Sequence, residues 1–277
     1  MLPSLLEVLL ASVPRAARIG AIRVVATPLV LVLALASTGA GAEEVRVAVA
    51  ANFTAPAKLI AEGFERATGH HVAISSGATG KFFAQIESGA PFDVLLSADQ
   101  QTPKRLEAES FAVPGTRFTY AIGQLVLWSS QAGVVDPQGA VLRSDAFTHV
   151  AICDPKLAPY GEAAVETMKA LGVYEKLQPK FVQGESITQA YQFVASGNAE
   201  IGFVALSQVF ADGKIREGSG WRVPSDLHAP LRQDAVLLLP GRDNPAARAW
   251  LAWLQGDTAK AAIRSFGYEV PPAVASK

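Results

Sequence analysis

Short apolar segments alternate with helical segments over the first half of this chain, and that alternation constrains the fold more strongly than any other feature. Residues 45–50, 71–75 and 92–97 have the apolar, β-branched character of buried strands, and a helical segment follows each of them after a short connection. Closely spaced strand–helix–strand units give a parallel sheet that is covered by helices. The sequence therefore predicts an α/β fold.

Small and polar residues stand where the first strand passes into its helix. Asn52 follows the strand, Thr54 is expected to cap the helix, and Pro56 suits its first turn because no N–H group is needed there. The first N–H groups of a helix have no intrahelical acceptor, so a corner of this kind can bind an anion. Taken alone, the corner is more often an ordinary strand–helix connection.

A turn of small residues precedes the second helix, which is predicted over residues 82–88. The turn runs from Ser75 to Lys81 and carries the hydroxyl group of Thr79. The phosphate-loop pattern G-x-x-x-x-G-K-[ST] requires glycine at position 75 and serine or threonine at position 82, where this chain has Ser75 and Phe82. The turn is therefore suited to a small anion, and not to a nucleotide with its magnesium ion.

A second strand–helix series follows a long apolar segment, residues 118–129, which is predicted to form one strand. The strands of this series are expected over residues 149–153, 180–183 and 201–205, and its helices over residues 162–171 and 188–195. Another long strand is expected over residues 234–239. The stretches near residues 121–125 and 232–236 are predicted to be paired crossings between two α/β lobes.

Four helix entries then become comparable, two in each lobe. They are Asn52 and Thr79 in the first lobe, and Pro159-Tyr160-Gly161 and Ser186-Ile187 in the second. If all four open on the cleft between the lobes, they surround a small anion with neutral N–H and O–H donors. The sequence therefore predicts an anion site in an interlobe cleft.

The composition argues against several other classes of function. A formal net charge of −1 and the lack of a stripe of Lys and Arg give no support for nucleic-acid binding. A single cysteine excludes an internal disulfide, and four scattered histidines argue against structural zinc. The G-x-S-x-G motif does not occur, and His149 and His228 have no evident partner, so a binding protein is favoured over an enzyme.

The N-terminal segment, residues 1–42, is predicted to be a signal peptide that is cleaved after Ala42. Arg15, Arg18 and Arg23 precede an apolar run over residues 24–37, and small residues follow it. The alternative is a membrane anchor. Pro28 interrupts the run, which is also shorter than the ~20 residues needed to span a bilayer. Cleavage and export are therefore the expectation.

The mature chain resembles the periplasmic molybdate-binding (ModA) proteins of ABC importers from about Val45 to about Val270. The motifs that carry the resemblance are Ala50-Ala51-Asn52-Phe53, Gln85-Ile86-Glu87-Ser88-Gly89-Ala90-Pro91-Phe92-Asp93, Ser97-Ala98-Asp99, Phe118-Thr119-Tyr120-Ala121-Ile122-Gly123, Ala158-Pro159-Tyr160-Gly161 and Gly202-Phe203-Val204-Ala205-Leu206. The resemblance implies the two-lobed periplasmic-binding-protein fold of type II, with a mixed sheet flanked by helices in each lobe. The expected lobes are residues 43–122 with 232–277, and residues 123–231.

The resemblance also implies which residues hold the anion. Aligned position by position, the oxyanion ligands fall on Asn52 and Thr79, and on Tyr160 and Ile187 through their backbone N–H groups. Ala51 and Ser186 are weaker candidates. Some members of the family have threonine at the position of Ala51 and a ligand tyrosine at that of Ala205, so fewer hydroxyl groups are available here. The side-chain amide of Asn52 is therefore expected to donate to the anion.

The function that the resemblance implies is the binding of molybdate, and also of tungstate, for delivery to the membrane permease of an ABC importer. The protein is then a periplasmic monomer without a cofactor, and the metal reaches it only as an oxyanion, with no side chain coordinating it directly. A binding protein or sensor for another tetrahedral oxyanion, such as sulfate, is the alternative.

Overall fold

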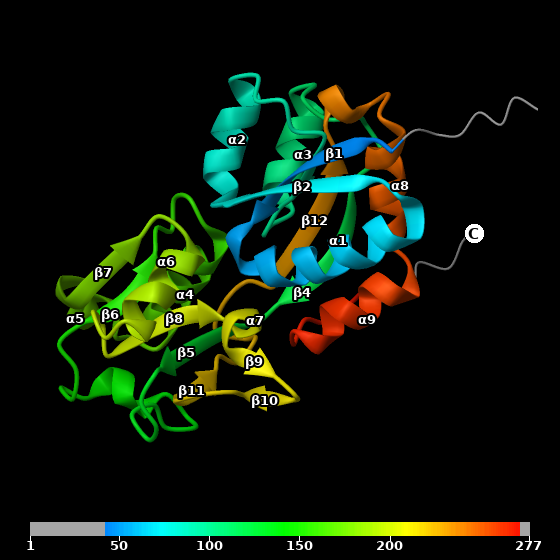
Figure 1. The fold of residues 1–277 in the computed structure, drawn as a ribbon. Helices are drawn as coiled ribbons and strands as arrows, with labels where there is room; N and C mark the ends of the chain where they lie inside the picture. Colours follow the sequence, from blue (N-terminus) through cyan, green and yellow to red (C-terminus); the bar gives the residue numbers. More distant parts are fainter. Residues whose placement is uncertain (1–41, 272–277) are drawn as a thin grey trace, which may run out of the picture. The chain divides into compact units, whose positions relative to one another are not determined.

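The computed structural model describes residues 42–271, so residues 1–41 of the predicted signal peptide lie outside the described residues (Figure 1). The first sheet has five strands in the order β2-β1-β3-β12-β4. Its strands are β1 (Glu44–Ala50), β2 (His71–Gly77), β3 (Val94–Leu96), β4 (Phe118–Gly123) and β12 (Leu231–Leu237). β1 pairs in parallel with β2 and β3, whereas β12 pairs antiparallel with β3 and β4.

The second sheet also has five strands, in the order β11-β5-β8-β6-β7. Its strands are β5 (Leu125–Ser129), β6 (Val150–Cys153), β7 (Phe181–Gly184), β8 (Ile201–Ala205) and β11 (Ser219–Arg222). β6 pairs in parallel with β7 and β8, and β5 pairs antiparallel with β8 and β11. A two-stranded ribbon of β9 (Phe210–Ala211) and β10 (Lys214–Ile215) accompanies it. The two mixed sheets confirm the predicted fold class.

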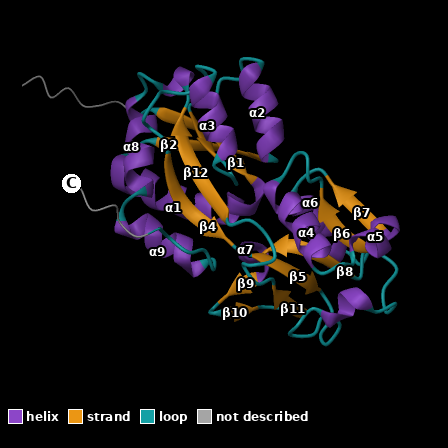
Figure 2. Cartoon of the chain, turned by 180° about the vertical axis from the view of Figure 1, so that it is seen from behind, coloured by secondary structure: helices purple, strands orange, loops and turns teal. Residues whose placement is uncertain are grey.

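Helices cover both faces of the first sheet, and the period-2 alternation of its strands explains how (Figure 2). On one face, apolar residues of β1 pack with the short helix η1 (Ala51–Phe53) and with α1 (Thr54–Thr68), α8 (Pro245–Leu254) and α9 (Asp257–Ser265). On the other face, Ala48, Leu95 and Val236 pack with α2 (Thr79–Glu87) and α3 (Gln101–Ala108). Because both faces are buried here, residues 47–50 of β1 and all of β3 are apolar.

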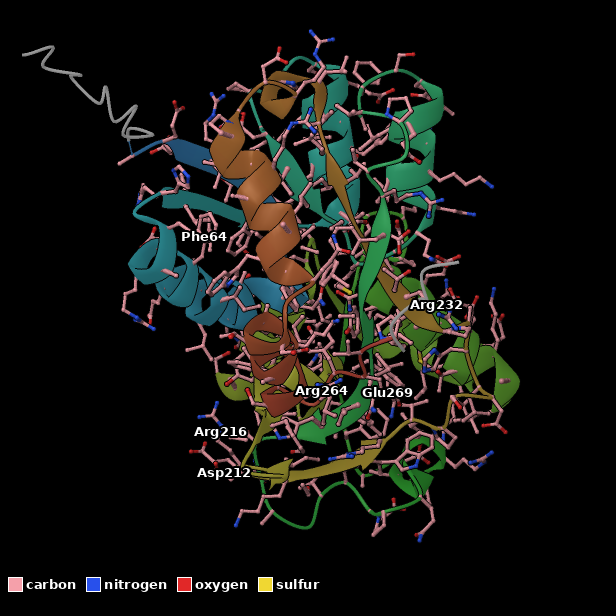
Figure 3. All side chains as sticks on the ribbon, turned by 90° about the vertical axis from the view of Figure 1, so that its right-hand side faces the viewer. Phe64, Asp212, Arg216, Arg232, Arg264 and Glu269 are labelled. Atoms are coloured by element: carbon pink, nitrogen blue, oxygen red, sulfur yellow. The ribbon has the colours of Figure 1, made fainter. Side chains whose placement is uncertain are left out.

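Aromatic side chains fill the contact between α1 and α8. Phe64 of α1, which is labelled in Figure 3, packs edge-on against Trp250 of α8 with ring centroids 5.3 Å apart. Trp250 is fully buried, as the amphipathic pattern of α8 predicts, and Trp253 is only partly buried. The second sheet is covered in the same way by α4 (Pro159–Ala170) and α6 (Ile187–Ala195), while α5 (Tyr174–Leu177) and α7 (Leu206–Val209) are short.

The prediction of one long strand over residues 118–129 is wrong in one respect, because the segment forms two strands that are separated by Gln124. β4 belongs to the first sheet and β5 to the second, so the chain crosses between lobes at this residue. It returns before β12, which starts at Leu231 and not at the expected residue 234. The paired crossings near these residues are confirmed by the β4–β12 pairing, whereas the exact residue limits of the two lobes stay a prediction.

Several helix starts differ from the expected ones by a few residues. α2 begins at Thr79, α4 at Pro159 and α6 at Ile187, each one to three residues earlier than predicted. Thr54 does not cap α1; its hydroxyl donates to the carbonyl group of Ala51 across η1 at 2.9 Å. The earlier starts place the predicted anion ligands in the first turns of their helices, where backbone N–H groups are unpaired.

Gly69 and Asp99 define the end of α1 and the start of α3. Gly69 ends α1 in the left-handed conformation, with φ of 76°, which glycine adopts without a steric penalty. Asp99 serves α3 as a cap, because its Oδ1 accepts from the N–H group of Thr102 at 2.8 Å. Among residues 42–271, no helix is both long and apolar enough to cross a membrane.

Asp93, in the motif Gly89-Ala90-Pro91-Phe92-Asp93, links three strands of the first sheet. Its buried carboxylate accepts from the backbone N–H of Arg46 at 2.7 Å and pairs with the Arg46 guanidinium group at 3.2 Å. Its backbone N–H donates to the carbonyl group of Arg46, and its own carbonyl group accepts from the N–H of Leu238. The role of Asp93 is therefore structural.

We expect Asp93→Ala to lower the free energy of unfolding by about 2–3 kcal/mol, because a buried donor and a guanidinium group lose their acceptor. Urea unfolding followed by circular dichroism measures the change. Asp243→Ala removes a carboxylate that is exposed beside Arg242 and serves as the control, with little expected effect. Equal stability of the two variants would contradict the structural role of Asp93.

Candidate functional site

A small cavity of about 10 Å³ lies where the helix starts of both lobes meet. Its lining residues come from the ends of β1 and β2, from the loop after β3, and from the first turns of α2, α4 and α6. They are small or present backbone to the cavity: Ala50, Ala51, Asn52, Gly77, Ala78, Thr79, Ala98, Ala158, Pro159, Tyr160 and Ile187. None of them carries a charged side chain.

The structure brings together the four residues that were predicted as main ligands. Asn52, Thr79, Tyr160 and Ile187 all line this cavity, and so does Ala51. Ser186 does not line it, because its hydroxyl group caps α6 and accepts from the N–H of Gln189. Sequence reasoning missed Ala98 and Ala158 as wall residues, since small apolar side chains give no signal of a site.

Thr79 is held so that its hydroxyl proton is free to donate. The residue is 2% exposed, and its Oγ1 accepts a hydrogen bond from the backbone N–H of Ala98 at 3.1 Å. A hydroxyl group has one proton and can both donate and accept. With the acceptor role taken up by Ala98, the O–H of Thr79 is available to an acceptor in the cavity.

Backbone N–H groups are the donors of the second lobe. Tyr160 and Ile187 stand in the first turns of α4 and α6, where N–H groups have no intrahelical acceptor. The neighbouring N–H of Gly161 donates to the carbonyl group of Ala158 at 2.8 Å, while those of Tyr160 and Ile187 find no protein acceptor within residues 42–271. Pro159 has no N–H group, so Tyr160 supplies the first one of α4.

The expectation that Asn52 donates to the anion through its side chain is wrong in this structure. The Nδ2 atom of Asn52 donates to Gln233 Oε1 at 2.9 Å and to the hydroxyl of Tyr268 at 2.9 Å, which uses both of its protons. The side chain is buried and lies within the protein interior. The donor that Asn52 can offer to the cavity is therefore its backbone N–H, in the first turn of η1.

A buried cluster of phenols and amides lies behind the cavity, formed by Asn52, Tyr120, Tyr160, Gln233 and Tyr268. Burial raises the pKa of Tyr120 and Tyr160 well above the usual value, and raises that of Tyr268 to about 12. All three phenols therefore keep their protons at neutral pH. No local pattern in the sequence indicates this cluster, because its members come from five separate segments.

Direct contacts join the two lobes around the cavity. The N–H of Gly80 donates to the carbonyl group of Leu157 at 2.9 Å, and the hydroxyl of Ser207 donates to the carbonyl group of Asn52 at 2.8 Å. On the rim, Lys81 of α2 forms an ion pair with Glu185 of the β7–α6 loop. The two lobes are therefore in direct contact at residues that line or adjoin the cavity.

The arrangement is suited to a small ligand that only accepts hydrogen bonds. The available donors are the hydroxyl group of Thr79 and the first N–H groups of three helices, and the partial positive charge of each helix N-terminus adds to them. Among residues 42–271, no group of three or more His, Cys, Asp or Glu side chains is placed to hold a metal ion. Neutral donors without a charged side chain in the lining are the pattern expected of an anion site.

Comparisons with known proteins agree with this chemistry. Residues 45–269 match the family described as bacterial extracellular solute-binding protein. The chain is 58% identical to a molybdate-binding protein ModA of Azotobacter vinelandii, over 84% of this chain and 93% of that protein. It is 55% identical to ModA of Rhodobacter capsulatus, over 89% and 96% of the two chains.

A solved structure shares the fold. The periplasmic molybdate-binding protein of Azotobacter vinelandii superimposes with a TM-score of 0.80 and 42% identity, over 82% of this chain and all of that one. The family is one of solute-binding proteins, which bears out the prediction of a binding protein rather than an enzyme. The chain belongs to the bacterial extracellular solute-binding proteins, and within them to the ModA family.

Proposed function

We propose that this protein binds molybdate, and with it tungstate, in the cavity between its lobes and delivers the anion to the membrane permease of an ABC importer. The observation that carries the proposal is the convergence of the four helix entries of Asn52, Thr79, Tyr160 and Ile187 on one uncharged cavity. Two relatives that are more than half identical to this chain are named molybdate-binding proteins.

The donors of the cavity favour a fully deprotonated dianion. Molybdate at neutral pH carries two charges and no proton, so its four oxygens only accept hydrogen bonds. Hydrogen phosphate must also donate, and its O–H group would face N–H groups in the closed site at a cost of about 1–3 kcal/mol. Sulfate has the same charge as molybdate and must be excluded by size.

Each proposed ligand residue has a defined donor. Thr79 donates through its hydroxyl group, and Asn52, Tyr160 and Ile187 donate through backbone N–H groups. Ala51 adds a wall and a neighbouring N–H group. Ser186 acts indirectly, because it caps the helix that presents Ile187. Neutral donors and helix N-termini stabilise the dianion without a buried cation.

Delivery requires the protein to be outside the cytoplasmic membrane, and we propose that it is periplasmic. The extracellular character of its family supports export, and residues 1–42 have the composition of a signal peptide. In this scheme the anion bridges two lobes, of which one comprises residues 43–122 and 232–277 and the other residues 123–231. The monomer with closed lobes is the form that the permease recognises.

Calorimetric titration of the mature protein tests the proposed ligand. We expect tight 1:1 binding of molybdate and tungstate, and binding of sulfate and hydrogen phosphate that is weaker by at least about tenfold, because of size and of the unpaired proton respectively. Tighter binding of sulfate than of molybdate would assign the site to another tetrahedral oxyanion. Binding of none of the four anions would contradict an oxyanion site.

Variants of Thr79 test the donor assignment. Thr79→Ala removes the hydroxyl group, and we expect the dissociation constant for molybdate to rise about tenfold or more, since a hydrogen bond to a charged group is lost. Thr79→Ser keeps the hydroxyl group and should retain most of the affinity. Calorimetry measures both, and equal affinities of the two variants would contradict the role of this hydroxyl group.

Asn52 does not provide an equally clean test. Its side chain holds Gln233 and Tyr268, so Asn52→Ala must lower stability as well as affinity.

N-terminal sequencing of the exported protein tests the cleavage site. Because small residues precede position 43, we expect the mature chain to begin at Glu43. A mature protein that retains residues 24–37 would favour the membrane anchor instead.

A further inference from the structure

Gln233 occupies a special place in the fold. It lies on β12, at the point where the pairing register between β12 and β4 shifts, shortly after the chain has returned from the second lobe. Its side chain is fully buried although it is polar. Figure 3 labels Arg232 and Glu269, which mark this region because Ile122 of β4 pairs with both. A buried amide at a lobe crossing calls for bonded partners.

The amide of Gln233 joins residues from both lobes. Its Oε1 atom accepts from Asn52 Nδ2 at 2.9 Å and from the hydroxyl of Tyr120 at 3.1 Å. Its Nε2 atom donates to the hydroxyl of Tyr160 at 3.3 Å. Asn52 and Tyr160 both line the anion cavity, one from η1 beside the first sheet and the other from α4 beside the second.

The close approach of the two lobes at this point depends on Gly123. A Cβ atom built on Gly123 would lie 2.1 Å from the hydroxyl oxygen of Tyr160 and 2.6 Å from Nε2 of Gln233. Only a glycine leaves room for that hydrogen bond at the crossing. The absence of a side chain at Gly123 therefore allows the amide of Gln233 and the phenol of Tyr160 to form their hydrogen bond.

We propose that Gln233 is a positioning residue for anion binding, which links the two halves of the site by bonding Asn52 and Tyr160 at the same time. This inference rests on the proposed function. Gln233 does not touch the cavity; it fixes Asn52 of one half and contacts the α4 residue of the other. Opening the lobes breaks the bond to Tyr160 and leaves the bonds to Asn52 and Tyr120 in place, so Gln233 favours the closed arrangement.

An amide is the side chain that fits this position. It accepts at one end and donates at the other without a charge, whereas a carboxylate only accepts and would add a negative charge close to a bound dianion. The other titratable groups that face Gln233 are the phenols of Tyr120, Tyr160 and Tyr268, which are uncharged at neutral pH. The adjacent Asp234 bonds a separate set that includes Arg117.

The test is Gln233→Glu, titrated with molybdate by calorimetry between pH 6 and pH 9. A protonated carboxyl group reproduces the acceptor and the donor of the amide, and burial raises the pKa of a carboxyl group into or near this range. We expect affinity near the wild-type value at the acidic end, and a loss of up to about tenfold per pH unit once the introduced carboxyl group ionises. Wild-type affinity should be almost constant over this range.

Gln124→Glu is the matched control. Gln124 lies at the other lobe crossing, and its amide donates only to the exposed carboxylate of Glu269 at 3.3 Å. The same chemical change there should leave molybdate affinity and its pH profile as in the wild type. The comparison separates a local effect at Gln233 from the general effect of one more negative charge.

A second variant covers the case in which Gln233→Glu does not fold. Tyr160→Phe keeps the backbone N–H that faces the cavity and removes the hydroxyl group that accepts from Gln233 Nε2. We expect affinity to fall severalfold, because the bond that links Gln233 to the α4 half of the site is lost.

Three outcomes would overturn the inference. Unchanged affinity in Gln233→Glu at every pH would do so, as would a loss that does not depend on pH, which indicates a merely structural role. If Gln233→Glu does not fold, unchanged affinity in Tyr160→Phe would do so. In each case wild-type binding leaves the proposed function intact, whereas failure of the wild type to bind molybdate would overturn that function and this inference with it.

Discussion

Unpaired backbone N–H groups at the first turns of helices are the feature on which the rest of this structure depends. Such groups need acceptors, and a helix cannot supply them from within. Here the first turns of α2, α4 and α6, together with η1, are directed at one cavity by strands of two separate sheets. The pairing of the strands within each sheet fixes the positions of donors that come from distant parts of the chain.

The cavity owes its character to what surrounds it as much as to its donors. Its walls are mainly alanine, glycine and proline, which let backbone approach closely and add no charge. Behind the walls, buried phenols and amides hold Asn52 and Tyr160 by hydrogen bonds. A dianion bound there would be stabilised by many neutral dipoles, which avoids the desolvation penalty of a buried lysine or arginine.

The main features of the fold could be predicted from local patterns and from the family resemblance. The strand at Ile201–Ala205 has the predicted limits, because glycine and asparagine mark the turn that precedes it. The break at Gln124 was missed because the apolar pattern continues through it. A local pattern can show that a segment is extended but cannot show which sheet it joins.

The candidate site follows the same division. The sequence by itself determined the four helix entries, because small residues, cap residues and prolines indicate where a helix begins and leaves its first N–H groups unpaired. Asn52, Thr79, Tyr160 and Ile187 at these entries all line one cavity. Only the tertiary structure decided how they act. The side chain of Asn52 donates a hydrogen bond to Gln233, and the hydroxyl group of Ser186 caps α6. The hydroxyl group of Thr79 accepts a hydrogen bond from the N–H of Ala98. These outcomes depend on partners 181, 3 and 19 residues away in the chain, and the distant ones are brought within hydrogen-bonding distance only by the folded sheets.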